Sequence, residues 1–243
     1  MGRITESIKH LIIINVILFI APQFFKGIDL QSLFALYFPK NENFGFWQYL
    51  THMFMHGSFS HILFNMYGLW AFGTPLEQRW GRNKFLFFYF SAGIGAGLIY
   101  TGVNYIEFNG IYNELLMQGV SPGAIQSMLS SGSYDTGLIT LPKETLTQFY
   151  SLYHTPAVGA SGAIYGVLVA FGLSFPNAKL ALIFFPVPIS AKYFIPLMIL
   201  GDLFFGVTKY SIGNVAHFAH IGGAIIGFLI AWYWKKNQFK RWN

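Results

Sequence analysis

The chain has 243 residues, of which 54% are hydrophobic, 19% aromatic and only 10% charged, and its formal net charge is +6. A soluble domain of this length carries about a quarter charged residues, so the composition argues against a soluble protein and for a membrane protein with one compact helical domain. The absence of cysteine excludes disulfides and thiolate chemistry, and the basic residues lie in short clusters rather than in one stripe, which disfavours a nucleic-acid partner.

Six apolar blocks follow one another along the chain. We expect each block to cross the membrane, which gives an all-α, polytopic bundle of six transmembrane helices that forms a single domain over residues 1–243. A span needs about 20 apolar residues, or as few as about 17, so the second and fifth blocks must be completed by polar flanks. The expected spans cover residues 8–25, 61–76, 85–106, 156–175, 193–207 and 215–234.

Two long connections lie between these spans. Residues 26–60 are rich in aromatic side chains and are expected at the membrane interface. Residues 107–155 form an extra-cytoplasmic insertion. In this insertion Ser121 is a candidate helix cap followed by Pro122 at the first helical position, and a second short helix is expected over 143–153.

The distribution of lysine and arginine predicts the orientation, because short cytoplasmic segments carry an excess of both. With the N-terminus inside, eleven lie on the cytoplasmic side and four outside. We therefore expect both termini in the cytoplasm and, since no long soluble domain is present, a bacterial plasma membrane. The inside set is Arg3, Lys9, Arg79, Arg82, Lys84, Lys179, Lys192, Lys235, Lys236, Lys240 and Arg241, and the outside set is Lys26, Lys40, Lys143 and Lys209.

Polar residues inside the spans are the functional candidates, because burying them in hydrocarbon is costly. Ser161 and His220 each lie five residues into an expected span that is entered from outside, about 7–8 Å below the helix start. His61 opens the second span from the same side, and Asn65 follows on the same helical face. Three helices are thus expected to bring a hydroxyl, two imidazoles and an amide to one depth, open to the outer side.

This combination suits acyl transfer. A serine hydroxyl is a weak nucleophile until a base takes its proton, and histidine does so near neutral pH. Side-chain N–H groups of His61 and Asn65, with the backbone N–H of Ser161, are candidate donors to a developing oxyanion. We therefore interpret Ser161 as a nucleophile and His220 as its base.

Two groups are candidates for orienting the His220 imidazole. Asp202 is the one acidic residue clearly within an apolar span, and its pairing with His220 stays open. Tyr165, one turn after Ser161, can instead stack on the ring, and we favour this orientation by packing. Glycines at helical spacing, among them Gly159 beside Ser161 and Gly223 after His220, predict close contact between the fourth and sixth spans.

The segments GASGAIYG (159–166), HGSFSHILFN (56–65) and AHFAHIGGAIIG (216–227) resemble, in order and spacing, the signatures of the rhomboid intramembrane serine proteases. The resemblance covers nearly the whole chain. It implies a six-helix bundle around a water-filled site, and a fifth span that moves to admit a substrate helix sideways. LEQRWG (76–81) resembles the family's structural Glu-x-Arg element.

The same resemblance implies roles for individual residues. Ser161 and His220 form a catalytic dyad, His61 and Asn65 are oxyanion donors, and Tyr165 packs on His220. His56 and Gly159 are supporting residues, and Asp202 matches a family aspartate that is not thought to be catalytic. One departure is Trp47-Gln48 in place of Trp-Arg, which puts the packing of the first outer loop in doubt.

The expected function is therefore intramembrane proteolysis of transmembrane or juxtamembrane segments, with membrane proteins as substrates, lipids as neighbours, and no cofactor or metal. An alternative is a catalytically silent relative that binds membrane helices. A transporter is disfavoured because the inner halves of the fourth and sixth spans are almost wholly apolar. A zinc protease would need His-Glu-x-x-His, which is absent, and an aspartyl protease would need two facing aspartates. His217, nearer the surface than His220, is expected either to support the site without touching the reacting atoms or to be structural.

Overall fold

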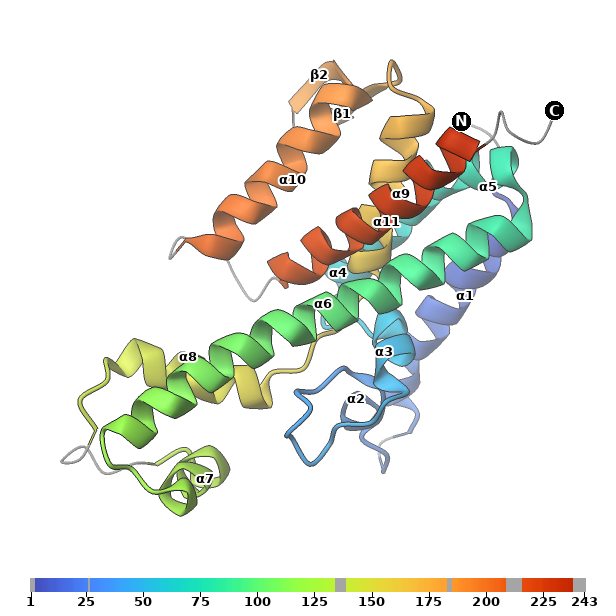
Figure 1. Cartoon of the computed structure of the whole chain (residues 1–243). Coiled ribbons are helices and arrows are strands. Elements are labelled where there is room, and N and C mark those ends of the chain that lie inside the picture. The colour runs from blue at the N-terminus through green and yellow to red at the C-terminus, as the bar shows by residue number, and fades with distance from the viewer. Residues whose placement is uncertain (1–2, 26, 134–138, 183–184, 209–215, 238–243) are drawn as a thin grey trace.

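The computed structural model describes residues 3–25, 27–133, 139–182, 185–208 and 216–237, and the regular elements of this part of the chain are helices, apart from one two-stranded hairpin and one isolated bridge between Leu36 and Ala157 (Figure 1). The all-α prediction is confirmed. The elements are α1 Glu6–Ile20, η1 Ala21–Gln23, α2 Leu30–Phe34, α3 Gln48–Thr51, η2 His52–Phe54, α4 Phe59–Gly68, the π-helical turn η3 Leu69–Gly73, α5 Thr74–Trp80, α6 Arg82–Met117, α7 Pro122–Ser131, α8 Lys143–His154, α9 Ser161–Ser174, the antiparallel pair β1 Lys179–Leu182 and β2 Phe185–Ser190, α10 Ala191–Val207 and α11 His217–Asn237.

Among the described residues, three helical stretches are long and apolar enough to cross a membrane, namely Glu6–Gln23, Arg82–Met117 and His217–Asn237. The apolar α9 is shorter, with 14 residues. A polytopic helical membrane protein is thus confirmed, while the number of six spans stays a prediction. The second expected span is carried by α4, η3 and α5, which follow one another without a break from Phe59 to Trp80.

Two helices begin or end well away from the edges of the expected spans, and each difference has a local cause. The helix α6 continues eleven residues beyond the expected end at Ile106, because its last turns bury Phe108, Ile111 and Leu115 under the insertion. The helix α9 begins at Ser161 rather than at Pro156. Gly159 has φ +120°, outside the helical region, so the helix cannot start before it.

The helix α9 is the centre of the bundle and packs against α6, α10, α11 and the segment from α4 to α5. Apart from Ser161, Tyr165 and Ser174, its side chains are apolar, and nine of its residues are buried, as expected for a helix surrounded by other helices. Its contact with α11 is backbone to backbone. A Cβ on Gly223 would lie 1.8 Å from the carbonyl oxygen of Gly162, so the predicted glycine contact is confirmed.

The insertion has a small core of its own. The end of α6 packs with α7 and α8 around Ile125 and Phe149, and Phe38 from the first connection joins this core. The Ser121 hydroxyl accepts a hydrogen bond from the N–H of Ala124 (3.2 Å), which confirms the predicted cap of α7. The second short helix, α8, is also confirmed. Figure 1 shows α7 and α8 at the far end of α6 from the chain termini.

The opposite end of the bundle, which we call the termini end, gathers the start of α1, the ends of α5, α9 and α11, and the start of α6 (Figure 1). There the Glu77 carboxylate accepts hydrogen bonds from the Thr5 hydroxyl and from the backbone N–H groups of Ser7 and Ile8. Trp80 meets Trp234 edge to face at 5.3 Å between ring centroids. Because α4, α9 and α11 all end toward the termini end, their N-terminal residues meet at the other end.

Candidate active site

Ser161 and His220 come together where the first turns of α9 and α11 touch. The distance from Ser161 Oγ to His220 Nε2 is 2.8 Å, and the two residues are 59 positions apart in the sequence. Both lie closer to their helix starts than expected, Ser161 as the first residue of α9 and His220 as the fourth of α11. The expected depth of five residues is therefore wrong, although the pairing predicted from it is present.

Tyr165 stacks on the His220 ring. The centroids are 4.2 Å apart and the planes differ by 11°. Tyr165 lies one helical turn after Ser161, so α9 supplies both the hydroxyl and the platform on which the imidazole rests. This is the packing that the sequence favoured.

A carboxylate also reaches the His220 imidazole, so the prediction that packing alone orients this ring is wrong. Asp202, buried on α10, places Oδ2 3.2 Å from His220 Nδ1 and Oδ1 2.5 Å from His217 Nδ1. A carboxylate only accepts, so both Nδ1 atoms donate to it. A neutral His220 then carries its proton on Nδ1, and Nε2 is free to accept from the Ser161 hydroxyl.

The bond between His217 and Asp202 is the feature that sequence reasoning missed. His217 was expected either to support the site without touching the reacting atoms or to be structural, and the structure places it on the same carboxylate as His220. The sequence feature that indicates this bond is the His-x-x-His spacing at the start of α11, together with Asp202, the acidic residue of α10. Periodicity does not fix which face of α10 turns toward α11, and that left the pairing open.

His61 and Asn65 lie on α4 against Gly159, on the approach to Ser161. A Cβ built on Gly159 would lie 2.7 Å from His61 Nε2 and 3.7 Å from Asn65 Nδ2, so only glycine fits there. Within the described part of the chain, the buried Asn65 Nδ2 has no hydrogen-bond acceptor. A buried donor without an acceptor is costly and rare, so this N–H group is available to another acceptor.

His56 and His52 support this region from the first connection. His56 meets His61 edge-on at 5.0 Å between centroids, and burial, with a smaller contribution from His61, lowers the pKa of His56 to about 4. His52 accepts the N–H of Gly159 on its carbonyl (2.9 Å). Burial lowers the pKa of His52 to about 4 as well, and its Nδ1 lies 2.8 Å from the Gln48 carbonyl. Both imidazoles are therefore neutral at pH 7.

The Gln48 side chain stabilises the first connection through its hydrogen bonds. Its amide donates to the carbonyl oxygens of Asn43 (2.7 Å) and Ser32 (3.2 Å), and its Oε1 accepts from the N–H of Tyr37 (3.1 Å). The side chain is fully buried. The loop with Trp47-Gln48 is thus tied together by a neutral amide.

The arrangement contains the parts of an acyl-transfer site. A hydroxyl faces an imidazole whose far nitrogen is bonded to a carboxylate, and unpaired N–H groups lie on the neighbouring helix. The seven residues singled out from the sequence, Ser161, His220, His61, Asn65, Tyr165, His56 and Gly159, are brought to one end of the bundle.

Comparison with known proteins agrees with the sequence signatures. The family model of the Rhomboid domain matches residues 43–237. Rhomboid protein 1, mitochondrial, of Saccharomyces cerevisiae is 28% identical over 185 residues, which are 75% of this chain and 40% of that protein. The presenilin-associated rhomboid-like protein, mitochondrial, of Rattus norvegicus is 30% identical over 193 residues (76% of this chain, 36% of that protein). Rhomboid protease GluP of Bacillus subtilis is 27% identical over 186 residues (76% and 25%).

These relatives correct one prediction. The chain spans less than half of the length of each of the three, and the yeast and rat proteins are named as mitochondrial. The expected location in a bacterial plasma membrane is therefore wrong. Relatives with mitochondrial names and a bacterial relative both match this region of the chain, so a helical membrane core did not discriminate between them.

Proposed function

This chain belongs to the rhomboid family, and on that premise we propose that it is an intramembrane serine endopeptidase that cleaves transmembrane or juxtamembrane segments of membrane proteins. The family consists in general of intramembrane serine proteases that act on membrane-protein substrates. The observation that carries the proposal for this chain is the 2.8 Å distance between Ser161 Oγ and His220 Nε2. A partly buried hydroxyl paired with an imidazole of fixed tautomer is an activated nucleophile.

In the proposed first step, the Ser161 oxygen attacks the carbonyl carbon of the scissile peptide bond and its proton passes to His220 Nε2. The imidazolium that forms is stabilised by Asp202 on the other nitrogen and by the stacked Tyr165 ring. The developing oxyanion lies toward α4, where Asn65 Nδ2 and His61 Nε2 donate to it. The backbone N–H of Ser161, in the first turn of α9, is unpaired within its helix and adds a third donor.

The second half of the reaction reuses the same groups. His220 returns its proton to the leaving amine as the C–N bond breaks, which leaves an ester on Ser161. Water then attacks the ester with His220 as base, and the acid product departs. No cofactor takes part in either step.

The proposed substrate reaches Ser161 from the membrane beside α10. This helix packs on α9 and α11 on one side and exposes Leu197 and Leu200 on the other. A helical substrate must unwind before its carbonyl can be attacked, so segments with glycine or proline are favoured. Because the yeast and rat relatives are named as mitochondrial, a mitochondrial membrane is the proposed location.

Replacing Ser161 by alanine tests the proposal. Ser161→Ala, reconstituted in liposomes with a model transmembrane substrate that contains a Gly-Pro step, is expected to lose cleavage by more than 10³-fold, because the nucleophile is removed. Ser60→Ala, which removes an exposed serine beside His61, is the matched control and should cleave normally. Cleavage by Ser161→Ala at the wild-type rate, in a protein with an unchanged thermal midpoint, would show that another group performs the reaction.

A further inference from the structure

A small cavity opens at the termini end of the bundle, at the other end of α9 from Ser161. It has a volume of about 140 Å³ and is formed where the ends of α5, α9 and α11 meet. This volume is well below the roughly 300–1,000 Å³ of a pocket for a drug-sized molecule. The lining residues are Arg79, Trp80, Leu173, Ser174, Ala231, Trp234 and Lys235.

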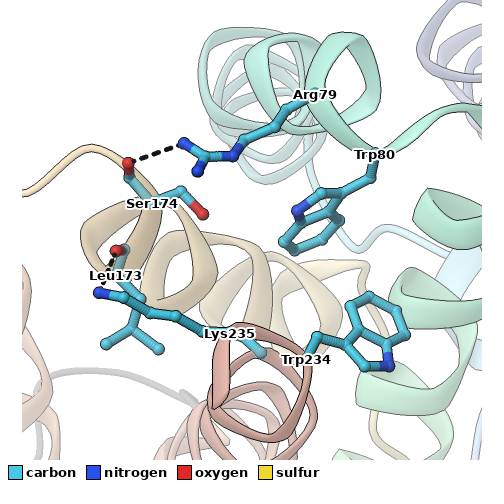
Figure 2. Close-up of a pocket in the computed structure, with 7 residues that line it drawn as sticks. Arg79, Trp80, Leu173, Ser174, Trp234 and Lys235 are labelled. Atoms are coloured by element: carbon cyan, nitrogen blue, oxygen red, sulfur yellow. Dashed lines mark hydrogen bonds between the residues drawn. The ribbon is translucent and has the colours of Figure 1, made fainter. Parts of the chain in front are cut away.

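Two cations converge on the cavity. Figure 2 shows Arg79 and Lys235 on opposite sides of the end of α9, with Ser174 between them. The Arg79 guanidinium donates to the Ser174 carbonyl and the Lys235 ammonium to the Leu173 carbonyl, each at 3.2 Å. In part, these bonds cap the last carbonyls of α9, where cations are favourable.

These two capping bonds involve only part of the N–H donors of Arg79 and Lys235. A guanidinium has five N–H groups and an ammonium three, and each of the two bonds occupies one of them. Both side chains are exposed at the cavity mouth. Among the described residues that line the cavity none is acidic, and the carboxylate of nearby Glu77 is turned to the start of α1. The cavity is therefore positively charged.

The aromatic residues place the cavity at the depth of lipid head groups. Trp80 and Trp234 lie edge to face on one wall (Figure 2), and Lys84 lies over the Trp234 ring at 4.3 Å. Tryptophan and cationic side chains at the end of membrane-crossing helices mark the boundary between hydrocarbon and water. Phe87, which is exposed and packs near Trp234, continues this surface toward the hydrocarbon.

We propose that this cavity binds the phosphate group of an anionic phospholipid, with its acyl chains along the outer faces of α6 and α11. A planar guanidinium matches two phosphate oxygens, and an ammonium with the Ser174 hydroxyl complements the others. A basic pocket between membrane helices is a known way to hold lipid head groups. The site is separate from the Ser161 end and its existence does not depend on the proteolytic activity.

The test is the affinity of the purified full chain for phosphatidylglycerol, measured by native mass spectrometry in a nonionic detergent, with phosphatidylcholine as the neutral comparison. Arg79→Gln and Lys235→Gln are each expected to weaken phosphatidylglycerol binding about fivefold, which corresponds to about 1 kcal/mol per basic residue at a lipid surface. Glutamine removes the positive charge and keeps a side-chain N–H donor. Lys236→Gln is the matched control, because Lys236 has the same charge on the next residue but lies over Trp232.

A second kind of variant keeps the charges that line the cavity and fills part of its volume. Ser174→Leu is expected to weaken phosphatidylglycerol binding at least as much as Arg79→Gln, while phosphatidylcholine binding stays unchanged. Three results would overturn the proposal. An equal loss of phosphatidylglycerol binding in Lys236→Gln and Lys235→Gln would mean that binding depends on unspecific surface charge, and full affinity in Ser174→Leu would mean that the lipid does not enter the cavity. Displacement of the lipid by inorganic phosphate at equal concentration would mean that the site binds free phosphate.

Discussion

At the scale of single residues, the site depends on groups whose hydrogen bonds are fixed before a substrate arrives. Asp202 sets the proton position on His220, and Tyr165 holds the ring plane. The sequence singled out Ser161, His220 and the two α4 residues His61 and Asn65, because polar residues inside apolar blocks are rare. It did not identify the Asp202–His217 bond, which depends on the rotation of α10 about its own axis.

Asn65 provides a prediction at this scale. Asn65→Asp keeps the size of the side chain but replaces the unpaired N–H donor by an acceptor. We expect kcat to fall by about 10²–10³-fold with little change in KM, because the donor acts on charge that develops in the transition state. The measurement is steady-state cleavage of a model substrate in liposomes. A kcat within twofold of wild type would remove Asn65 from the oxyanion site.

Two histidines of the first connection, His52 and His56, provide a second prediction. The pKa values of His52 and His56 are lowered to about 4 in the folded chain, against about 6.5 when unfolded, so the unfolded chain binds more protons between these values. Stability is therefore complete above pH 6.5 and declines as the pH falls toward 4. For His52 alone the loss approaches about 3 kcal/mol.

The check is the thermal unfolding midpoint in detergent at pH 7 and at pH 5. The midpoint should fall on acidification, and the fall should shrink in His52→Gln. His10→Gln, which changes an exposed histidine of α1, serves as the control and should behave as wild type. An acid response that is identical in His52→Gln and in wild type would contradict the assignment.

At the scale of elements, the contact between α9 and α11 controls the site. The two helices touch through Gly162, Gly166, Gly223 and Gly227, so that Ser161 and His220 meet within hydrogen-bond distance. The glycine spacing was enough to predict this contact. The start of α9 was not predictable from apolar periodicity, since Pro156–Ala160 is as apolar as the helix that follows and only the backbone angle of Gly159 ends the extended segment.

Gly223→Ala tests that contact. Its new Cβ would lie 1.8 Å from the Gly162 carbonyl oxygen, so the helices must separate, and overpacking of this kind costs about 1–3 kcal/mol or more. We expect a lower thermal midpoint and a loss of cleavage, since Ser161 and His220 move apart with the helices. Gly102→Ala on α6 has open space around its Cβ and should leave both unchanged. Equal midpoints for the two variants would contradict the close packing.

At the scale of the whole molecule, the bundle separates two surfaces. The starts of α4, α9 and α11 form the reactive end, which the first connection and the insertion flank, and the ends of α5, α9 and α11 form the basic termini end. Composition and charge clusters predicted the helical membrane fold and the gathering of basic residues near the termini. They did not predict the second small core of the insertion, because its members, from Phe38 to Phe149, are distant in sequence and show no single periodic pattern.

Whether Ser161 and His220 form an activated pair is tested by covalent labelling of the purified chain with a fluorophosphonate, followed by identification of the modified residue. We expect that Ser161 is labelled, that the label is lost in His220→Ala, and that it persists in His217→Ala at a reduced rate. Equal labelling of Ser161 in wild type and in His220→Ala, or no labelling of Ser161 in a folded wild-type chain, would contradict the proposal that these two side chains form an activated pair.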